Sequence, residues 1–367
     1  MASEHHAAVT VIGGGPAGAV TAMLLRRLDI SVLVLERGWY GDRSAIDVLT
    51  PEIRVELSRL GIWDRFTAAD PTPCHAIQSA WGDDGVRERH FIRNPHGCGW
   101  SVRRCWLDSL LAHCARDAGA IFLTHARPVR VARAGAEWRL HVETPSGAFT
   151  ARSDFLVDAS GAGAALARML GARRRTLDRM IGLSRLFAGQ GVSSDPDPVL
   201  LLESHPLGWW YSVHTDDRAV LVTLLTGGAT LRGTGDARLR AWNLALAGTQ
   251  QTRRRIEQCG ASPVLKARAA DVGCLDRAVG DGWLAVGDAA STFDPLSGTG
   301  VRKALVEAQR AAKAIRATLS GATEALPAYG AAVARSFEWQ LRKRDEHYGR
   351  ERRWQNAAFW SARSRPV

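Results

Sequence analysis

The spacing of hydrophobic residues near the start of the chain changes twice within thirty residues. Val9, Val11 and Ile12 form a short apolar run, and residues 30–35 form a second one. Between them, residues 20–28 carry apolar side chains at helical spacing, and three glycines precede that stretch. The β-branched run predicts a buried strand, and the longer periodic stretch predicts a helix. The order strand, glycine turn, helix, strand predicts the first unit of a parallel α/β sheet.

The rest of the chain alternates between helical and strand-like patterns. Helical spacing predicts helices over residues 51–66, 102–119, 301–319 and 326–367. Short apolar runs predict strands over residues 77–81, 89–92, 121–123, 155–158 and 283–286, and a hairpin over 129–132 and 138–143. Alternating runs are typical of an antiparallel sheet with one covered face, and they occur at residues 180–187, 199–203, 209–214 and 219–225.

We therefore expect an α/β fold in three parts. A discontinuous dinucleotide-binding domain is predicted to comprise residues 1–75, 100–175 and 271–325. An antiparallel sheet that forms the substrate domain is predicted for residues 76–99 and 176–270, and a helical tail for residues 326–367.

Composition and charge exclude some classes of partner. The 367-residue chain has a net charge of +11, but its basic residues are spread along it and cluster only at 173–175 and 253–255, so we expect no nucleic-acid partner. No apolar run approaches the roughly 18 residues that span a bilayer, so no membrane association is expected. The first strand begins too early for a secretory signal, which favours a cytoplasmic protein. The six cysteines lack metal-binding spacing, which predicts reduced thiols and no metal site.

Gly13, Gly15 and Gly18 have the G-x-G-x-x-G spacing of a turn that binds a dinucleotide. The first glycine permits the tight turn, the second lets the backbone approach a pyrophosphate, and the third allows close packing of helix on strand. The helix that begins here offers free N–H groups and the positive end of its dipole. Glu36 ends the second strand, where its carboxylate can accept hydrogen bonds from a ribose.

Three further segments have compatible chemistry. Asp288 follows a predicted strand in G-D-A-A, where it can bind a polyol or cap a helix. Residues 295–300 form a small-residue loop before a helix, whose N–H groups could stabilise negative charge on a ring carbonyl. Asp158, Ser160 and Gly161 form a third loop, but Leu166 replaces the last glycine of a second fingerprint. No dedicated site for a second nucleotide is therefore expected.

Together these segments resemble the FAD-dependent monooxygenases of the p-hydroxybenzoate-hydroxylase fold. The resemblance implies a Rossmann-like FAD-binding domain and places Arg104, in S-V-R-R-C-W-L-D, at the family's flavin-contacting arginine. It implies that the following residues bind FAD: Gly13, Gly15, Pro16, Ala17, Gly18, Glu36, Arg37, Arg104, Val129, Asp158, Gly287, Asp288, Pro295, Gly298, Thr299 and Gly300.

A narrower resemblance is carried by L-G-I-W-D-R-F, N-P-H-G-C-G-W, G-W-W-Y-S and F-D-P-L-S-G-T-G. These motifs are similar to those of tryptophan halogenases and of flavoproteins that hydroxylate a peptidyl tryptophan during tryptophylquinone biogenesis. Three departures stand out. No lysine precedes Lys266, although the halogenases use one in the N-terminal third. The W-x-W-x-I-P motif is missing, and Asp42-Arg43-Ser44 replaces the usual G-E-S, which affects flavin contacts and the substrate tunnel.

The resemblance favours hydroxylation of an aromatic ring, with tryptophan, free or in a peptide or protein, as the leading substrate. A halogenase, a flavin-dependent dehydrogenase or reductase, and a non-catalytic flavoprotein that chaperones a partner stay open as alternatives. Electrons would come from NAD(P)H or from a partner flavin reductase. Candidates for the substrate pocket are His75, His90, His96, Trp209, Trp210 and Tyr211, of which His96, Trp210 and Tyr211 are weak candidates for a catalytic role.

Overall fold

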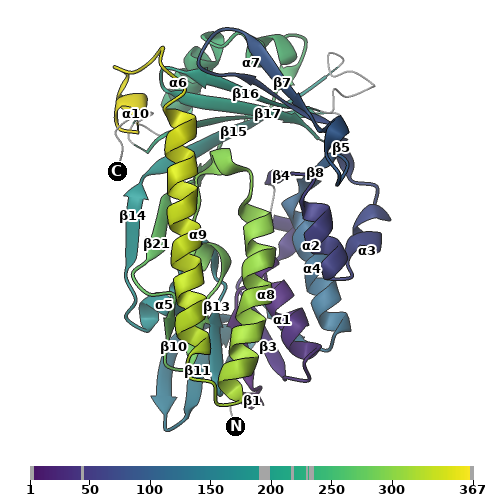
Figure 1. The fold of residues 1–367 in the computed structure, drawn as a ribbon, viewed down its shortest axis with the longest axis vertical. Coiled ribbons are helices and arrows are strands. Elements are labelled where there is room, and N and C mark those ends of the chain that lie inside the picture. Colours follow the sequence, from purple (N-terminus) through teal and green to yellow (C-terminus); the bar gives the residue numbers. More distant parts are fainter. Residues whose placement is uncertain are drawn as a thin grey trace.

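The structure is a computed structural model that describes residues 4–42, 45–189, 199–215, 219–228, 230 and 235–363. A parallel sheet with its helices forms one end of the molecule, and a large, mainly antiparallel sheet forms the other (Figure 1). The long helix α9 (Ala325–Tyr348) runs from the first end to the second (Figure 1). The predicted α/β fold class is confirmed.

The parallel sheet has six strands in the order β22-β23-β13-β2-β3-β9. All are parallel except the edge strand β22, which pairs antiparallel with β23. Their bounds are β2 (Val9–Ile12), β3 (Val32–Glu36), β9 (Ile121–Thr124), β13 (Phe155–Asp158), β22 (Val279–Gly280) and β23 (Trp283–Ala285). Because β2, β3 and β13 run the same way, the glycine turn, Glu36 and Asp158 meet at one edge of the sheet.

Both faces of this sheet are covered, which is why β2, β3 and β13 are buried along their whole length. Helices α1 (Pro16–Arg26), α4 (Arg104–Asp117) and α8 (Gly300–Leu319) pack together on one face, with α1 in contact with the other two. A four-stranded sheet contacts the other face in the order β1 (Glu4–His6), β12 (Gly147–Ser153), β11 (Glu137–Thr144) and β10 (Arg127–Ala134). The predicted hairpin is β10–β11, whereas β12 was not predicted.

The large sheet follows the order β19-β15-β18-β17-β16-β6-β7, and β20 also pairs with β15. Its bounds are β6 (Ala76–Ala80), β7 (Val86–His90), β15 (Met180–Ala188), β16 (Val199–His205), β17 (Gly208–His214), β18 (Ala219–Gly227), β19 (Gly260–Ala261) and β20 (Lys266–Ala269). Helices α6 (Gly235–Ala247) and α7 (Gln251–Arg255) lie against this sheet (Figure 1). The Trp242 ring of α6 packs 5.2 Å from that of Trp210 on β17.

Two predicted helices were wrong in extent. The stretch over residues 51–66 forms two helices, α2 (Ile53–Arg59) and α3 (Trp63–Thr67), because Gly61 has a φ of 65°, which no helical residue adopts. Residues 102–103 belong to β8 (Gly99–Arg103), which pairs with β4 (Ile46–Leu49) and β5 (Thr72–Cys74). Helix α4 therefore begins at Arg104 itself.

The predicted tail helix ends earlier than expected. Helix α9 stops at Tyr348, and after a non-helical segment the short helix α10 (Ala358–Ser361) packs beside the large sheet. The rings of Tyr348 and Trp360 are 5.7 Å apart, and Trp360 is fully buried. No helix in the described ranges is both long enough and apolar enough to cross a membrane.

Candidate active site

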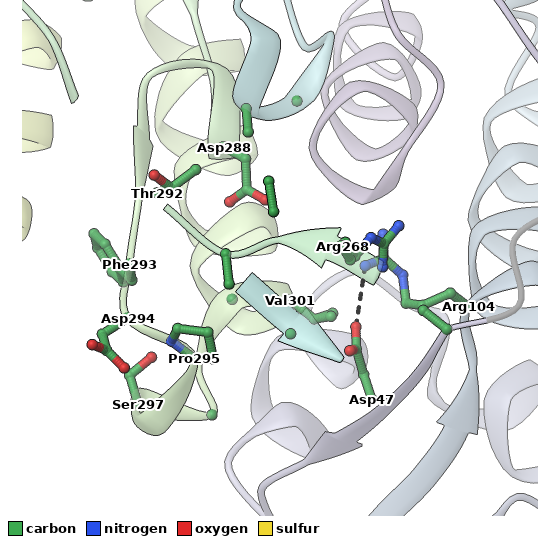
Figure 2. Close-up of a pocket in the computed structure, with 18 of the residues that line it drawn as sticks. Asp47, Arg104, Arg268, Asp288, Thr292, Phe293, Asp294, Pro295, Ser297 and Val301 are labelled. Carbon is green, nitrogen blue, oxygen red and sulfur yellow. Dashed lines mark hydrogen bonds and ion pairs between the residues drawn. The ribbon is translucent and has the colours of Figure 1, made fainter. Parts of the chain in front are cut away.

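One cavity of about 2370 Å³ extends from the glycine turn to the large sheet. Its walls come from both ends of the molecule, so residues far apart in sequence face one another across it. Figure 2 shows Asp288, Pro295 and Val301 on one side of the space and Asp47 with Arg104 on another. Most predicted cofactor-binding residues line it: Gly13, Gly15, Pro16, Ala17, Glu36, Arg37, Arg104, Val129, Asp288, Pro295, Gly298, Thr299 and Gly300.

The glycine turn joins β2 to α1 at the edge of the parallel sheet. Gly18 does not line the cavity, because it lies in the first turn of α1 against the turn itself. A Cβ atom on Gly18 would come 1.9 Å from the carbonyl oxygen of Gly13. Gly15 is the N-cap residue of α1, so the first N–H groups of the helix open toward the cavity.

Glu36 fixes the shape of this turn. The Glu36 side chain is nearly buried, and its Oε2 accepts a hydrogen bond of 2.7 Å from the Gly14 N–H. Its Oε1 accepts another of 3.1 Å from the Gly38 N–H. The carboxylate thus ties the end of β3 to the glycine turn while still lining the cavity.

Asp158 occupies an equivalent strand end but points elsewhere. Its Oδ1 accepts hydrogen bonds from the N–H of Ser160 (2.9 Å) and from the Ser160 hydroxyl (2.6 Å), and its Oδ2 accepts one from the Ala167 N–H (2.7 Å). The side chain is fully buried, and burial raises its pKa despite these bonds. Asp158 does not line the cavity, although Ser160 and Gly161 do. Its role here is to shape the loop.

The loop that carries Asp288 is held by two charged residues that the sequence analysis missed. Glu307 Oε2 accepts a hydrogen bond of 2.8 Å from the Gly287 N–H, and Lys303 Nζ donates one of 2.8 Å to the Gly287 carbonyl. Lys303 and Glu307 are buried on α8, one turn apart, and pair at 3.4 Å. Gly287 is thereby fixed beneath the loop and does not line the cavity, whereas Asp288 is exposed to it.

The loop at residues 295–300 ends at the N-terminus of α8. Asp294 caps its single 3₁₀ turn by accepting a hydrogen bond of 2.9 Å from the Leu296 N–H. Gly298, Thr299 and Gly300 then line the cavity where α8 begins. The first N–H groups of this twenty-residue helix have no partner within the helix itself, so this end favours negative charge.

Arg104 begins α4 and reaches the cavity between two acids. It forms an ion pair of 3.1 Å with Asp47 of β4 and a two-bond contact with Asp108 at 3.0 and 3.2 Å. Burial disfavours the guanidinium charge, but Asp47 and Asp108 outweigh that effect and raise the pKa of Arg104. The arginine is therefore held rigidly at the cavity wall.

The pocket candidates divide between the two faces of the large sheet. Trp209 and Tyr211 line the cavity, whereas Trp210 points to the opposite face and packs on Trp242. The expectation that Trp210 lies at the pocket was wrong, because successive strand residues alternate faces and α6 covers the face that Trp210 occupies. The three candidate histidines, His75, His90 and His96, do not line the cavity. Arg43 and Ser44 lie outside the described residues.

Helix α9 connects the loop at residues 295–300 to the large sheet. Trp209 Nε1 donates a hydrogen bond of 3.0 Å to the Tyr348 hydroxyl, which in turn donates one of 3.1 Å to Asp294. Arg344 adds a hydrogen bond of 3.2 Å to the same Asp294 oxygen. Asp294 therefore joins α9, the loop at 295–300 and strand β17 in one buried network.

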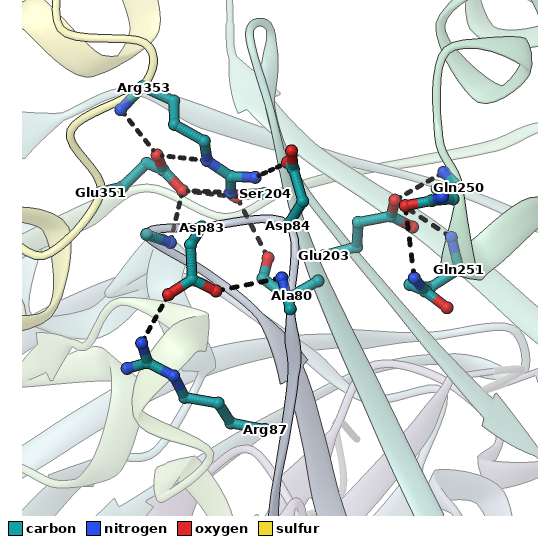
Figure 3. A network of polar contacts seen from close by, with 12 residues as sticks. Ala80, Asp83, Asp84, Arg87, Glu203, Ser204, Gln250, Gln251, Glu351 and Arg353 are labelled. Carbon is teal, nitrogen blue, oxygen red and sulfur yellow. Dashed lines mark hydrogen bonds and ion pairs between the residues drawn. The ribbon is translucent and has the colours of Figure 1, made fainter.

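A second network fixes the segment after α9 to β16 (Figure 3). The buried Glu351 accepts hydrogen bonds from the Ser204 hydroxyl (2.6 Å), the Gly82 N–H (2.8 Å) and Arg353 (2.6 Å). Burial opposes the carboxylate charge, but these donors outweigh it and lower the pKa of Glu351 to about 2. Arg350 and Arg352 of this segment line the cavity together with His347, in the last turn of α9; these contributions were not predicted from the sequence.

The donor set of the cavity fits FAD. Two helix N-termini suit a pyrophosphate and a ring carbonyl, and the carboxylates of Glu36 and Asp288 suit hydroxyl groups. A single cavity is also large enough to extend from the dinucleotide turn to an aromatic wall. Fold and site together define a flavin-dependent oxidoreductase.

Comparison with known proteins identifies the family. The chain belongs to the family described as FAD binding domain, whose profile matches residues 6–344. LodB of Marinomonas mediterranea, named as an FAD-dependent oxidoreductase, is 27% identical over 357 residues, which cover 96% of this chain and 95% of LodB. The protein is thus an FAD-binding oxidoreductase of this family, as its glycine turn and Asp288 loop indicated.

Two solved structures share this fold. The myxobacterial chondrochloren halogenase CndH superposes with a TM-score of 0.88 and 21% identity, covering 98% of this chain and 86% of CndH. The peptidyl tryptophan dihydroxylase QhpG, essential for tryptophylquinone cofactor biogenesis, superposes with a TM-score of 0.80 and 24% identity, covering 98% of this chain and 79% of QhpG. At these identities the likeness establishes the fold.

Proposed function

We propose that this protein is an FAD-dependent monooxygenase that hydroxylates an aromatic ring, with tryptophan, free or within a peptide or protein, as the leading substrate. The observation that carries the proposal is the continuity of the cavity. It runs from Gly13 and Gly15 through Asp288 and the start of α8 to Trp209 and Tyr211 on the large sheet. An aromatic ring on that wall would lie across the cavity from the residues proposed to hold the flavin.

Each part of FAD would have its own group of residues. Gly13, Gly15, Pro16 and Ala17 would hold the pyrophosphate, and Glu36 the adenosine ribose, with Arg37 and Val129 beside it. Asp288 would bind the ribityl chain and Arg104 the flavin. The pyrimidine edge would lie at Gly298, Thr299 and Gly300. When bound and reduced, FAD supplies activated oxygen, and the protein orients the ring and excludes water.

A substrate carried by a peptide or protein is supported by two observations. QhpG, which has the same fold, acts on a peptidyl tryptophan. Arg350 and Arg352 line the cavity, where they would attract an acidic partner. A tryptophan-containing acidic peptide should therefore be a better substrate than free tryptophan, which steady-state kinetics with both can measure.

Halogenation is the second candidate function. CndH is a halogenase, and Lys266 of β20 lines the cavity of this chain. The other lysine near the site, Lys303, is buried and bonded to backbone carbonyls. Lys266 is therefore the residue that a halogenase mechanism would need, and Lys266→Met should abolish halogen transfer if that mechanism operates.

Mass spectrometry distinguishes these functions. The holoenzyme is supplied with tryptophan or the peptide, with ¹⁸O-labelled dioxygen, and with or without bromide. Electrons are supplied by NAD(P)H alone or through a flavin reductase, which also identifies the electron source. Incorporation of labelled oxygen into the ring supports hydroxylation, whereas bromide-dependent bromination refutes it. A product without either atom would indicate a dehydrogenase or reductase. Asp288→Ala and Gly15→Val serve as flavin-free controls, because both should lose the yellow absorbance.

A further inference from the structure

Three hydroxyl-bearing side chains form one row across the cavity face of the large sheet. Tyr211 of β17 lies directly opposite Thr223 of β18, and Thr223 lies directly opposite Ser184 of β15. All three line the cavity. Directly opposite residues on neighbouring strands share a face, with Cβ atoms about 4.5–5.5 Å apart. The pairing register itself therefore builds this hydroxyl row.

A hydrogen bond connects two members of the hydroxyl row. The hydroxyl oxygens of Ser184 and Thr223 are 2.8 Å apart. A hydroxyl group has one hydrogen and two acceptor lone pairs. Ser184 therefore keeps at least one lone pair for a donor in the cavity, whichever of the two hydroxyls donates.

The two ends of the hydroxyl row differ in chemistry. Burial raises the pKa of Tyr211, and Asp47 of β4 adds to this effect while Arg268 of β20 opposes it. Tyr211 therefore stays a neutral phenol with its own hydrogen. Lys266, opposite Ser184 on β20, stands at the exposed end of the row.

The surface on both sides of the hydroxyl row is apolar. Leu186 and Leu221 line the cavity toward one end of these strands, and Leu225 and Trp209 line it toward the other. A flat ligand over β15, β17 and β18 thus meets hydrocarbon on both sides of the hydroxyl row. A ring system with a single N–H at its edge, such as indole, matches that pattern because its donor finds the acceptor at Ser184.

We propose that the hydroxyl row recognises the polar edge of the aromatic substrate, with Ser184 Oγ accepting the ring N–H of an indole. This inference rests on the proposed function and deepens it by naming the residue that selects the ring. Thr223 acts as a positioning residue, because its hydrogen bond to Ser184 orients the Ser184 hydroxyl. Enclosed polar sites of this kind discriminate against analogues that lack the matching group.

Binding of isosteric probes tests the inference without turnover. The oxidised holoenzyme is titrated with indole, benzofuran and indene, and dissociation constants are read from the flavin absorbance change. One hydrogen bond of ordinary strength should make indole bind roughly three- to tenfold more tightly than the other two probes. Ser184→Ala should remove this preference, and Ser184→Cys should reduce it because sulfur is a weak acceptor.

Two further variants serve as controls. Tyr211→Phe should keep the preference, because the acceptor at Ser184 is intact. Ser79→Ala makes the same change elsewhere on this face and should also keep it; Ser79 lines the cavity but is separated from Tyr211 by Leu202 in the strand register. Flavin content and the unfolding midpoint must match the wild type in every variant.

The inference is overturned if the wild type binds indole and indene equally, or if both Ser184 variants keep the full preference. These results are separable from those on the proposed function. Oxygen insertion without any probe preference would leave the hydroxylase proposal standing and remove the role of Ser184. A retained preference with bromide transfer would do the reverse.

Discussion

The buried ion pair between Lys303 and Glu307 on α8 is expected to contribute to both stability and flavin binding. Glu307→Gln keeps the size of the side chain and an oxygen that can accept the Gly287 N–H. It removes the negative charge beside Lys303, whose side chain is only 4% exposed. Lys303 would then be a buried cation with no anionic partner on α8. Its remaining contacts would be the carbonyl oxygens of Gly287 and Ser291, at 2.8 and 2.6 Å, and the Phe293 ring at 4.8 Å.

Breaking a buried ion pair by removing one partner costs about 3–5 kcal/mol. The two carbonyl bonds to Lys303 survive, so we expect a loss near the lower end, about 3 kcal/mol. The double variant Lys303→Met with Glu307→Gln leaves no buried charge at this position. It should therefore lose less than the sum of the two single variants, which a double-mutant cycle measures as a coupling energy.

Urea unfolding of the FAD-free forms gives the free energies, and titration of FAD into the same proteins gives its dissociation constant. Weaker FAD binding is expected in Glu307→Gln, because the loop that carries Asp288 is fixed through Gly287. If the free energy of unfolding of Glu307→Gln lies within about 0.5 kcal/mol of the wild-type value and its FAD affinity is unchanged, the role assigned to α8 is refuted. Lys313→Met, at an exposed position on the same helix, is the control. Gln309→Glu is unsuitable as a control because the Gln309 side chain is hydrogen-bonded to Glu56.

Three other changes test separate parts of the structure. Gly18→Ala places a methyl group 1.9 Å from the Gly13 oxygen, so the turn must shift. We expect flavin loss on desalting and a destabilisation of about 1–3 kcal/mol. Full flavin retention would contradict the packing argument. Tyr348→Phe leaves the buried Trp209 N–H without its acceptor and removes one donor from Asp294, which keeps Arg344. This change should cost about 1–3 kcal/mol in urea unfolding, and a change below about 0.5 kcal/mol would show that the network is dispensable. The pKa of Glu351 falls from 4.5 in the unfolded chain to about 2 in the fold, so its contribution is complete above pH 4.5 and is lost as the pH falls toward 2. Stability measured against pH should therefore decline more steeply over that interval in the wild type than in Glu351→Gln, and equal slopes would argue against this assignment.

Local patterns were sufficient for the first unit of the parallel sheet. The strands at Val9–Ile12 and Val32–Glu36 occur where the sequence predicted them. The predicted helix lies between them but begins earlier, at Pro16, so Gly18 belongs to its first turn. Each depends on neighbours in sequence: β-branched runs, helical spacing and a turn that requires glycine. The same holds for the start of α8 after residues 295–300.

Contacts distant in sequence explain where prediction failed. Asp158 and Asp288 both lie at the end of an apolar strand. The Asp158 carboxylate accepts hydrogen bonds from N–H groups of the segment that follows it, whereas Asp288 faces the cavity. The spacing of Lys303 and Glu307 was visible as a helical pair. Its function was not, because Gly287 meets them only when α8 packs beneath its loop.

The sequence by itself determined the dinucleotide turn, the strands and helix of the first parallel unit, and the family, because each of these is encoded in short segments. Only the tertiary structure decided which face of the large sheet borders the cavity. Successive strand residues point to opposite faces, and α6 covers the face that carries Trp210, which leaves Tyr211 on the cavity face. It also placed the segment after α9 against that cavity, because buried hydrogen bonds between residues more than a hundred positions apart cannot be inferred from local spacing.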